Sequence, residues 1–191
     1  MSIRSARSLL LAAVTLALLG CEKSSTTEPV ASGELVVRIG ASAPLTGPQA
    51  HIGKDNESGT RMAIEDANAN GIVIGGRKVR FELISEDDQA DPKTATIVAQ
   101  KLVDNKVSGV IGHLNSGTSI PASRIYNDNG IVQISPSATA VEFTAKGYKT
   151  TFRVMANDAQ QGRVLGEYAT MNLAAKKIAV IDDRTGYGQG L

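Results

Sequence analysis

Two kinds of hydrophobic pattern alternate along the chain from residue 35 to its end. Short runs rich in Val and Ile, typical of buried strands, occur at 35–40, 78–85, 107–111, 131–134, 151–154 and 177–181. Between these runs, apolar residues recur at the spacing of a helix face and predict helices over 55–69, from 92 onward, over 119–129 and over 158–173. Strands that alternate with helices favour a parallel sheet covered by helices. We therefore predict an α/β fold with a doubly wound parallel sheet.

Residues 1–20 have the parts of a secretory signal peptide. Arg4 and Arg7 supply a positively charged start, and an apolar run from Leu9 to Leu19 follows. This run is shorter than the roughly 20 apolar residues that a membrane-spanning helix needs. We therefore predict that residues 1–20 direct export and are removed from the mature protein.

Cys21 is the only cysteine of the chain, and it follows Leu18-Leu19-Gly20 directly. A lone cysteine cannot form a disulfide within the chain. The sequence Leu-Leu-Gly-Cys resembles the bacterial lipobox, which implies cleavage before Cys21 and attachment of diacylglycerol to its thiol. An ordinary signal peptide followed by a chance cysteine is the alternative. Because residues 22–33 are polar and rich in Ser, Thr, Pro and Gly, we predict a lipid-anchored flexible tether over 21–34.

Composition narrows the classes of partner. The formal net charge is +1, and removal of Arg4 and Arg7 leaves 18 basic against 19 acidic residues. No basic patch or basic helix follows the tether, so the sequence argues against a nucleic-acid partner. A surface of mixed charge that keeps the domain soluble is the simpler interpretation.

Two loops rich in hydroxyl groups follow predicted strands, at residues 112–119 and 135–139. In open α/β sheets ligands bind outside the carboxyl ends of the strands, near helix N-termini. Free N–H groups of a helix start, together with hydroxyls, suit a carboxylate, and backbone carbonyls suit an ammonium group. The pair of loops therefore favours a zwitterionic amino acid as ligand. Simple helix capping by Thr118 or Ser119, and a Pro-directed turn after Ser135, remain the alternatives.

Signals for catalysis, metals or cofactors are weak. The chain has no phosphate-binding loop, no dinucleotide fingerprint at the first turn and no G-x-S-x-G elbow, and no ligand spacing links His51 with His113. An acidic cluster at a strand end is interpreted as a solvated turn with a helix cap rather than a cation site, and its members are Glu86, Asp87, Asp88 and Asp91. Tyr187, in the loop 182–188, could cover an apolar ligand side chain or lie on a surface turn. We predict a protein that is not an enzyme and that has no catalytic residues, metal or cofactor.

Several stretches, in order from residue 35 to the end, carry a family resemblance. They are GASAPLTGPQAHIG at 40–53, residues 59–71, DDQADP at 87–92, VIGHLNS at 110–116, ISPSAT at 134–139, residues 158–162, and Tyr187-Gly188. Together they resemble the Leu/Ile/Val-binding proteins of ABC amino-acid importers, among the type I periplasmic binding proteins. The resemblance implies two α/β lobes that close on a ligand about a three-segment hinge. It makes residues 35–157 an incomplete lobe one and 158–191 the start of a truncated lobe two.

The resemblance also assigns roles at the ligand site. It implies that Ser116 and Thr139 hold the ligand carboxylate, that the backbone carbonyl of Ser137 receives the ammonium, and that Tyr187 is an aromatic from lobe two. The remaining residues of this ligand-binding set are Asn115, Ala138 and Ile52. Leucine-binding relatives have Tyr where Ile52 stands, and some have a disulfide where Ala90 and Asn115 stand. The family's acidic partner for the ammonium would lie beyond Leu191.

The predicted function is that of an extracytoplasmic, lipid-anchored binding protein of an ABC importer. It would capture a small amino acid, Leu, Ile or Val, by hinge closure at the outer face of the bacterial cell membrane and pass it to ABC permease subunits. A periplasmic amino-acid or amide sensor that signals to a receptor is the alternative, and an extracytoplasmic enzyme is a third possibility. We also expect the 191-residue chain alone to be prone to aggregation and to bind leucine weakly.

Overall fold

The computed structural model describes residues 33–191, and their strands form a single six-stranded sheet in the order β2-β3-β1-β4-β5-β6. The strands are β1 (Leu35–Ala43), β2 (Val73–Ile74), β3 (Arg77–Asp87), β4 (Gly109–Gly112), β5 (Val132–Ser135) and β6 (Thr151–Arg153). All neighbours pair in parallel except β2, which forms a short antiparallel hairpin with β3. The sheet of parallel strands that the sequence predicts is confirmed.

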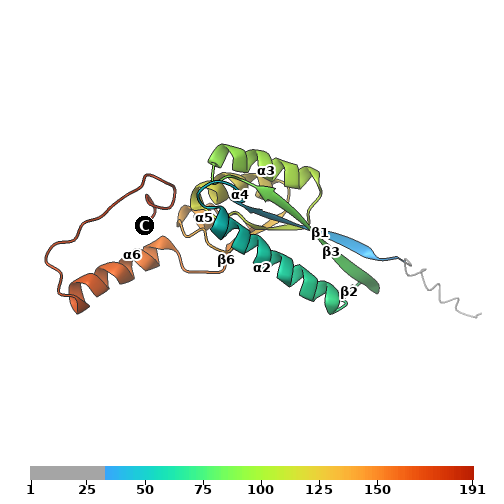
Figure 1. The fold of residues 1–191 in the computed structure, drawn as a ribbon, viewed down its shortest axis with the longest axis horizontal. Coiled ribbons are helices and arrows are strands. Elements are labelled where there is room, and N and C mark those ends of the chain that lie inside the picture. Colours follow the sequence, from blue (N-terminus) through green and yellow to red (C-terminus); the bar gives the residue numbers. More distant parts are fainter. Residues whose placement is uncertain (1–32) are drawn as a thin grey trace, which may run out of the picture. The chain divides into compact units, whose positions relative to one another are not determined.

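Helices cover the sheet on both faces (Figure 1). They are α2 (Ala50–Ala69), α3 (Pro92–Asp104), α4 (Ser116–Asp128), α5 (Glu142–Ala145) and α6 (Asp158–Glu167), and α6 continues as the π-helical segment η1 (Tyr168–Asn172). α3 begins as the sequence predicts, because the Asp91 side chain accepts the N–H of Thr94 at 2.6 Å and Pro92 needs no N–H partner.

The densest core lies between the sheet and the helices α3 and α4. Leu102 and Ala99 of α3 are completely buried there, together with Ala122 and Tyr126 of α4 and Val110 of β4. These α3 residues belong to the apolar stripe that predicts the helix, so one sequence pattern explains both the helix and the face that it buries.

On the other face, α2 lies against β1 and β3 (Figure 1). Near the end of α2, Asn68 donates to the carbonyl of Phe81 at 3.0 Å and accepts the N–H of Phe81 at 2.8 Å. The Asn68 amide thus pairs with the backbone N–H and C=O of Phe81 in β3. The two-residue β2 does not reach these groups, because it pairs only with Arg77 and Lys78. Near the start of α2, Gly53 packs directly against the backbone of Pro44.

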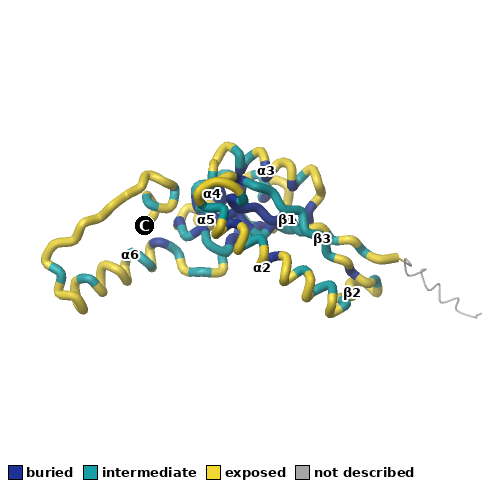
Figure 2. The backbone as a smooth tube through the Cα atoms, in the orientation of Figure 1, coloured by how far each residue is buried: buried dark blue, intermediate teal, exposed yellow. Residues whose placement is uncertain are grey.

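Some predicted boundaries and one predicted strand differ from the structure. α2 begins at Ala50 rather than at residue 55, and α4 begins at Ser116 rather than at 119. The strand predicted at 177–181 is wrong: this segment is irregular, and Val180 and Ile181 are 90% and 91% exposed. A strand exists only where a neighbour accepts its hydrogen bonds, and no strand of the described chain lies beside it. Figure 2 shows that α6 and the segment after it are mostly exposed.

The predicted signal peptide, the lipidated Cys21 and most of the predicted tether lie outside the described residues. Within residues 33–191, no helix combines the length and the apolar character needed to cross a bilayer.

Candidate ligand-binding site

A cavity of about 230 Å³ opens where the carboxyl ends of the central strands meet the C-terminal segment. Its lining residues are Gln49, Ile52, Leu114, Asn115, Ser116, Ser137, Asp183, Thr185 and Tyr187. The predicted ligand residues among them are Ile52, Asn115, Ser116, Ser137 and Tyr187. The structure thus brings together residues that are far apart in the sequence, and their role in binding remains a prediction.

The two hydroxyl-rich loops are tied to each other by hydrogen bonds. Ser137 Oγ donates to the carbonyl of Leu114 at 2.6 Å, and Ser135 Oγ donates to the carbonyl of His113 at 2.7 Å. Ser116 Oγ accepts the N–H of Ala140 at 3.2 Å. Because these bonds join neighbouring strand ends, they hold both loops in fixed positions around the cavity.

Ser116 is the first residue of α4. The N–H groups of Thr118 and Ser119 donate to the carbonyl of the preceding residue, Asn115, at 3.2 and 2.9 Å, which leaves the N–H groups of Ser116 and Gly117 without a carbonyl partner in the helix. The partial positive charge of a helix start favours an anionic group nearby. The N-cap residue is Asn115, whose side chain makes no cap bond, rather than the Thr118 or Ser119 of the capping alternative. The start of α4 therefore offers unpaired donors beside the Ser116 hydroxyl, an arrangement that suits a carboxylate.

Ala138 and Thr139 do not line the cavity. Ala138 is completely buried, and its N–H donates to Ser135 Oγ at 2.9 Å. The hydroxyl of Thr139 is buried and has no hydrogen-bond partner among the described residues. A buried hydroxyl without a partner is unfavourable, so Thr139 is suited to receive a ligand group.

Gln49 is a residue of the site that the sequence did not reveal. Its Oε1 accepts a hydrogen bond from Asn115 Nδ2 at 2.8 Å, while Oδ1 of Asn115 is buried without a partner in the part of the chain that the structure describes. Gln49 is the N-cap residue of α2 and Ile52 lies in the first turn of this helix, and both line the cavity together with Ser116, the first residue of α4. Ile52 is 45% exposed and presents an apolar side chain to the cavity.

A fully buried polar network supports the loop from behind. His113 Nδ1 lies 2.7 Å from Asp88 Oδ2 and 3.0 Å from Ser42 Oγ, and His113 Nε2 lies 3.1 Å from the hydroxyl of Tyr126. Burial, together with the charge of Asp88, raises the pKa of Tyr126, so its hydroxyl stays protonated. For Asp88 the interpretation as a solvated turn is wrong, because its side chain is completely buried against His113.

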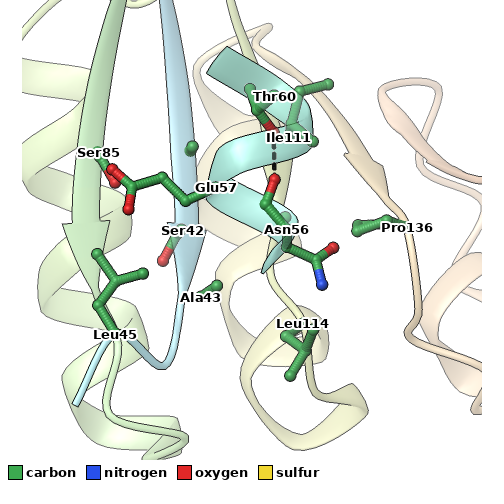
Figure 3. Close-up of a pocket in the computed structure, with 12 residues that line it drawn as sticks. Ser42, Ala43, Leu45, Asn56, Glu57, Thr60, Ser85, Ile111, Leu114 and Pro136 are labelled. Atoms are coloured by element: carbon green, nitrogen blue, oxygen red, sulfur yellow. Dashed lines mark hydrogen bonds between the residues drawn. The ribbon is translucent and has the colours of Figure 1, made fainter. Parts of the chain in front are cut away.

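Two further cavities adjoin α2. The first, about 10 Å³, lies between the start of α2 and the ends of β1 and β4 and has room for about one water molecule (Figure 3). The second, about 620 Å³, is lined mainly by apolar residues of α2 and the sheet, among them Ile39, Ala63, Phe81 and Ile111. The first cavity includes the hydroxyls of Ser42, Thr60 and Ser85 but is too small for an amino acid, and the second is mainly apolar, so the cavity at Ser116 is the better candidate for a polar ligand.

Comparison with known proteins identifies the family. The family model described as periplasmic binding protein matches residues 36–191. The chain belongs to the periplasmic binding protein family. This result confirms the resemblance that the loop motifs carry.

Curated relatives of this periplasmic binding protein bear amino-acid-binding names. It is 44% identical over 155 residues to the Leu/Ile/Val-binding protein homolog 1 of Brucella abortus, an alignment that covers 81% of this chain and 41% of the relative. It is 41% identical, with the same coverage, to the leucine-, isoleucine-, valine-, threonine- and alanine-binding protein of Pseudomonas aeruginosa. The chain thus spans about two fifths of the length of these relatives.

Solved structures similar to this periplasmic binding protein share its fold and differ in their ligands. The branched-chain amino acid transporter substrate-binding protein LivJ of Streptococcus pneumoniae, in complex with isoleucine, matches with a TM-score of 0.73 and 30% identity over 81% of this chain and 44% of LivJ. An ABC transporter solute-binding protein of R. palustris, in complex with benzoate, matches with a TM-score of 0.71 and 26% identity over 81% and 42% of the two chains. The predicted type I periplasmic binding protein fold is confirmed.

Proposed function

We propose that this chain is the ligand-capturing part of an extracytoplasmic, lipid-anchored binding protein that delivers small amino acids to an ABC permease. The proposed ligands are the branched-chain amino acids Leu, Ile and Val. The observation that carries the proposal is the cavity that joins the start of α4 at Ser116 with Ser137, Ile52 and Tyr187. The names of the curated relatives and the isoleucine complex of LivJ support the same ligand class.

The chemistry of the cavity suits the two ends of such a ligand. The hydroxyl of Ser116 and the free N–H groups of α4 would hold the carboxylate, and Thr139 would add a second hydroxyl. The backbone carbonyl of Ser137 would receive the ammonium, because the Ser137 side chain is already bonded to the carbonyl of Leu114. Ile52 and Tyr187 would enclose an apolar side chain.

The mechanism that we propose is hinge closure without catalysis. Residues 35–157 form the first lobe and 158–191 begin the second, with the first hinge crossing near 156–158. A ligand that contacts both lobes favours the closed arrangement by the difference in its affinity for the two states. Ser116 and Tyr187, from opposite sides of the proposed hinge, line the same cavity, which supports this mechanism. Cys21 would carry the lipid that keeps the protein at the membrane.

The proposal is tested by NMR titration of the isotopically labelled 191-residue chain with each of the 20 amino acids, a method that detects weak binding. We expect Leu, Ile and Val to shift the resonances of residues around Ser116. Ser116→Ala should weaken leucine binding about tenfold or more, because a hydrogen bond to a charged group contributes about 1.5–3 kcal/mol. The matched control is Ser108→Ala, just before the opposite end of β4. Absence of any shift with amino acids, or equal binding by both variants, would contradict the proposal.

A further inference from the structure

The hairpin of β2 and β3 carries an exposed apolar tip. Ile72, Val73 and Ile74 are 38%, 61% and 51% exposed, and they are the only three consecutive large hydrophobic residues within 33–191 that are exposed. Figure 2 shows this exposed part of the chain at β2. Single exposed apolar residues are normal on a protein surface, whereas a contiguous group marks a contact with another surface. The hairpin tip, residues 72–74, is therefore a candidate interaction surface.

The first described residues of the chain lie beside the hairpin tip. Arg77 Nε donates to the carbonyl of Gly33 at 3.2 Å, and Arg77 Nη2 donates to the carbonyl of Glu34 at 3.1 Å. Arg77 also pairs with Ile74 across the hairpin. These bonds fix the start of the folded domain next to the hairpin tip, so the predicted tether joins the domain at this place.

A lipid on Cys21 would keep this end of the domain near the membrane. Residues 22–33 separate Cys21 from the first strand, and a flexible tether of that length has an end-to-end distance of about 20 Å. Such a tether gives the hairpin tip an effective concentration at the membrane on the order of millimolar. A tip with only weak affinity for lipid would therefore still contact the membrane.

The charges beside the hairpin tip suit a phospholipid surface. The nearby acids Glu34 and Glu82 are paired with Arg80 at 3.0 and 2.7 Å, whereas Arg77 and Lys78 have no acidic partner in the described chain. Free cations bind phosphate headgroups, and apolar side chains enter the boundary between headgroups and acyl chains. A second copy of the chain is a poorer partner, because the edge strand β2 has only two residues to which it could add a strand.

We infer that the hairpin tip contacts the phospholipid surface of the membrane, with Arg77 and Lys78 among the headgroups, and that this contact orients the domain. The inference goes beyond the proposed function and rests on the lipid anchor proposed there. From this end of the sheet β1 runs for nine residues, about 30 Å, to the end at which the ligand cavity opens. The contact would therefore hold the cavity away from the membrane and open to ligand in solution. Delivery to a permease would require the tip to leave the lipid, which a weak contact permits.

The test uses the chain from Cys21 to its end, which contains every described residue, with ¹³C labels on the Ile and Val methyl groups. Cys21, the only cysteine, is coupled to a maleimide phospholipid in nanodiscs of phosphatidylcholine and phosphatidylglycerol, so the anchor does not depend on cellular lipidation. A second sample adds a lipid with a gadolinium chelate on its headgroup. We expect the methyl resonances of the hairpin tip to lose most of their intensity. Those of Ile52 at the cavity and of Ile97, which is 63% exposed on α3 and lies apart from β2 (Figure 1), should keep it.

Val73→Asn combined with Ile74→Asn should restore the intensity of Ile72, and the matched control Ile97→Asn should leave the loss at the hairpin tip unchanged. Equal loss at all exposed methyl groups, or no loss at the tip, would overturn the inference. Tip resonances that shift with protein concentration in the absence of nanodiscs would assign the tip to a contact between two copies and would overturn it as well. Leucine binding should be the same in all these variants, so a failure of the membrane contact leaves the proposed function intact.

Discussion

Gly53 lies in the first turn of α2, where the helix backbone meets Pro44. A Cβ atom at this position would lie 2.0 Å from the carbonyl oxygen of Pro44 and 2.6 Å from its carbonyl carbon. Gly59 lies further along the same helix, and a Cβ atom there would meet nothing within 4 Å. The two glycines therefore form a matched pair for a substitution to alanine.

The two substitutions should change stability in opposite directions. Alanine is favoured over glycine in a helix by about 0.5–1 kcal/mol, so Gly59→Ala should raise the free energy of unfolding by that amount. Gly53→Ala has the same gain in helix propensity. The new Cβ atom would clash with Pro44, however, so backbone atoms must move, and such overpacking costs about 1–3 kcal/mol or more. We expect Gly53→Ala to lower the free energy of unfolding by roughly 1–2 kcal/mol.

The assay is urea unfolding of the 191-residue chain, followed by circular dichroism at 222 nm, for both variants and the unmodified chain. Gly53→Ala should also weaken leucine binding, because Gln49 and Ile52 in the same turn line the cavity. Gly59→Ala should leave binding unchanged. If the Gly53→Ala variant is as stable as the Gly59→Ala variant, α2 does not pack closely against Pro44 at this position.

Two further substitutions test polar groups of the fold, Tyr126 in the network behind the cavity and Asp87 at the end of β3. Tyr126→Phe leaves the buried Nε2 of His113 without a partner and should lower the free energy of unfolding, measured in urea, by about 1–3 kcal/mol. The exposed control Tyr168→Phe should change it by less than about 0.5 kcal/mol. Equal effects of the two substitutions would contradict the hydrogen bond between Tyr126 and His113. Burial tends to raise the pKa of Asp87, but hydrogen bonds from Thr46 and from backbone N–H groups outweigh it and lower the pKa below 3.8. The stability that the Asp87 carboxylate contributes is therefore present above pH 3.8 and is lost as the pH falls through the lower pKa of the folded state. The difference in the free energy of unfolding between the unmodified chain and Asp87→Asn should therefore disappear on acidification. A difference that does not change with pH would contradict the lowered pKa of Asp87.

Sequence patterns predicted the fold where local signals and tertiary packing agree. The stripe that includes Ala99 and Leu102 predicted α3 and also forms its buried face. Asp91 caps the same helix as expected. The start of α2 was missed by several residues because its N-cap residue, Gln49, makes no side-chain cap bond, so no local signal marks it. The strand predicted at 177–181 failed because a β-branched run forms a strand only beside a partner, which the run does not specify.

The sequence predicted the loops of the candidate site but did not predict which charged side chains near it are buried. Hydroxyl-rich turns after strands, together with the family resemblance, led to Ser116 and Ser137, and the parallel topology explains why they meet. The pairing of Asp88 with His113 was missed, because an acidic residue in a turn is usually solvated and burial is set by strands distant in the sequence. Asp158 was not among the predicted site residues, and only the structure shows that it is buried.

The most direct test of the proposed function is a crystal structure of the 191-residue chain grown with saturating leucine. We predict leucine in the cavity beside α4, with its carboxylate within hydrogen-bond distance of Ser116 Oγ and Thr139 Oγ1. Its side chain should contact Ile52 and Tyr187. Leucine bound elsewhere, for example in the apolar cavity under α2, or bound with its carboxylate away from Ser116, would contradict the account.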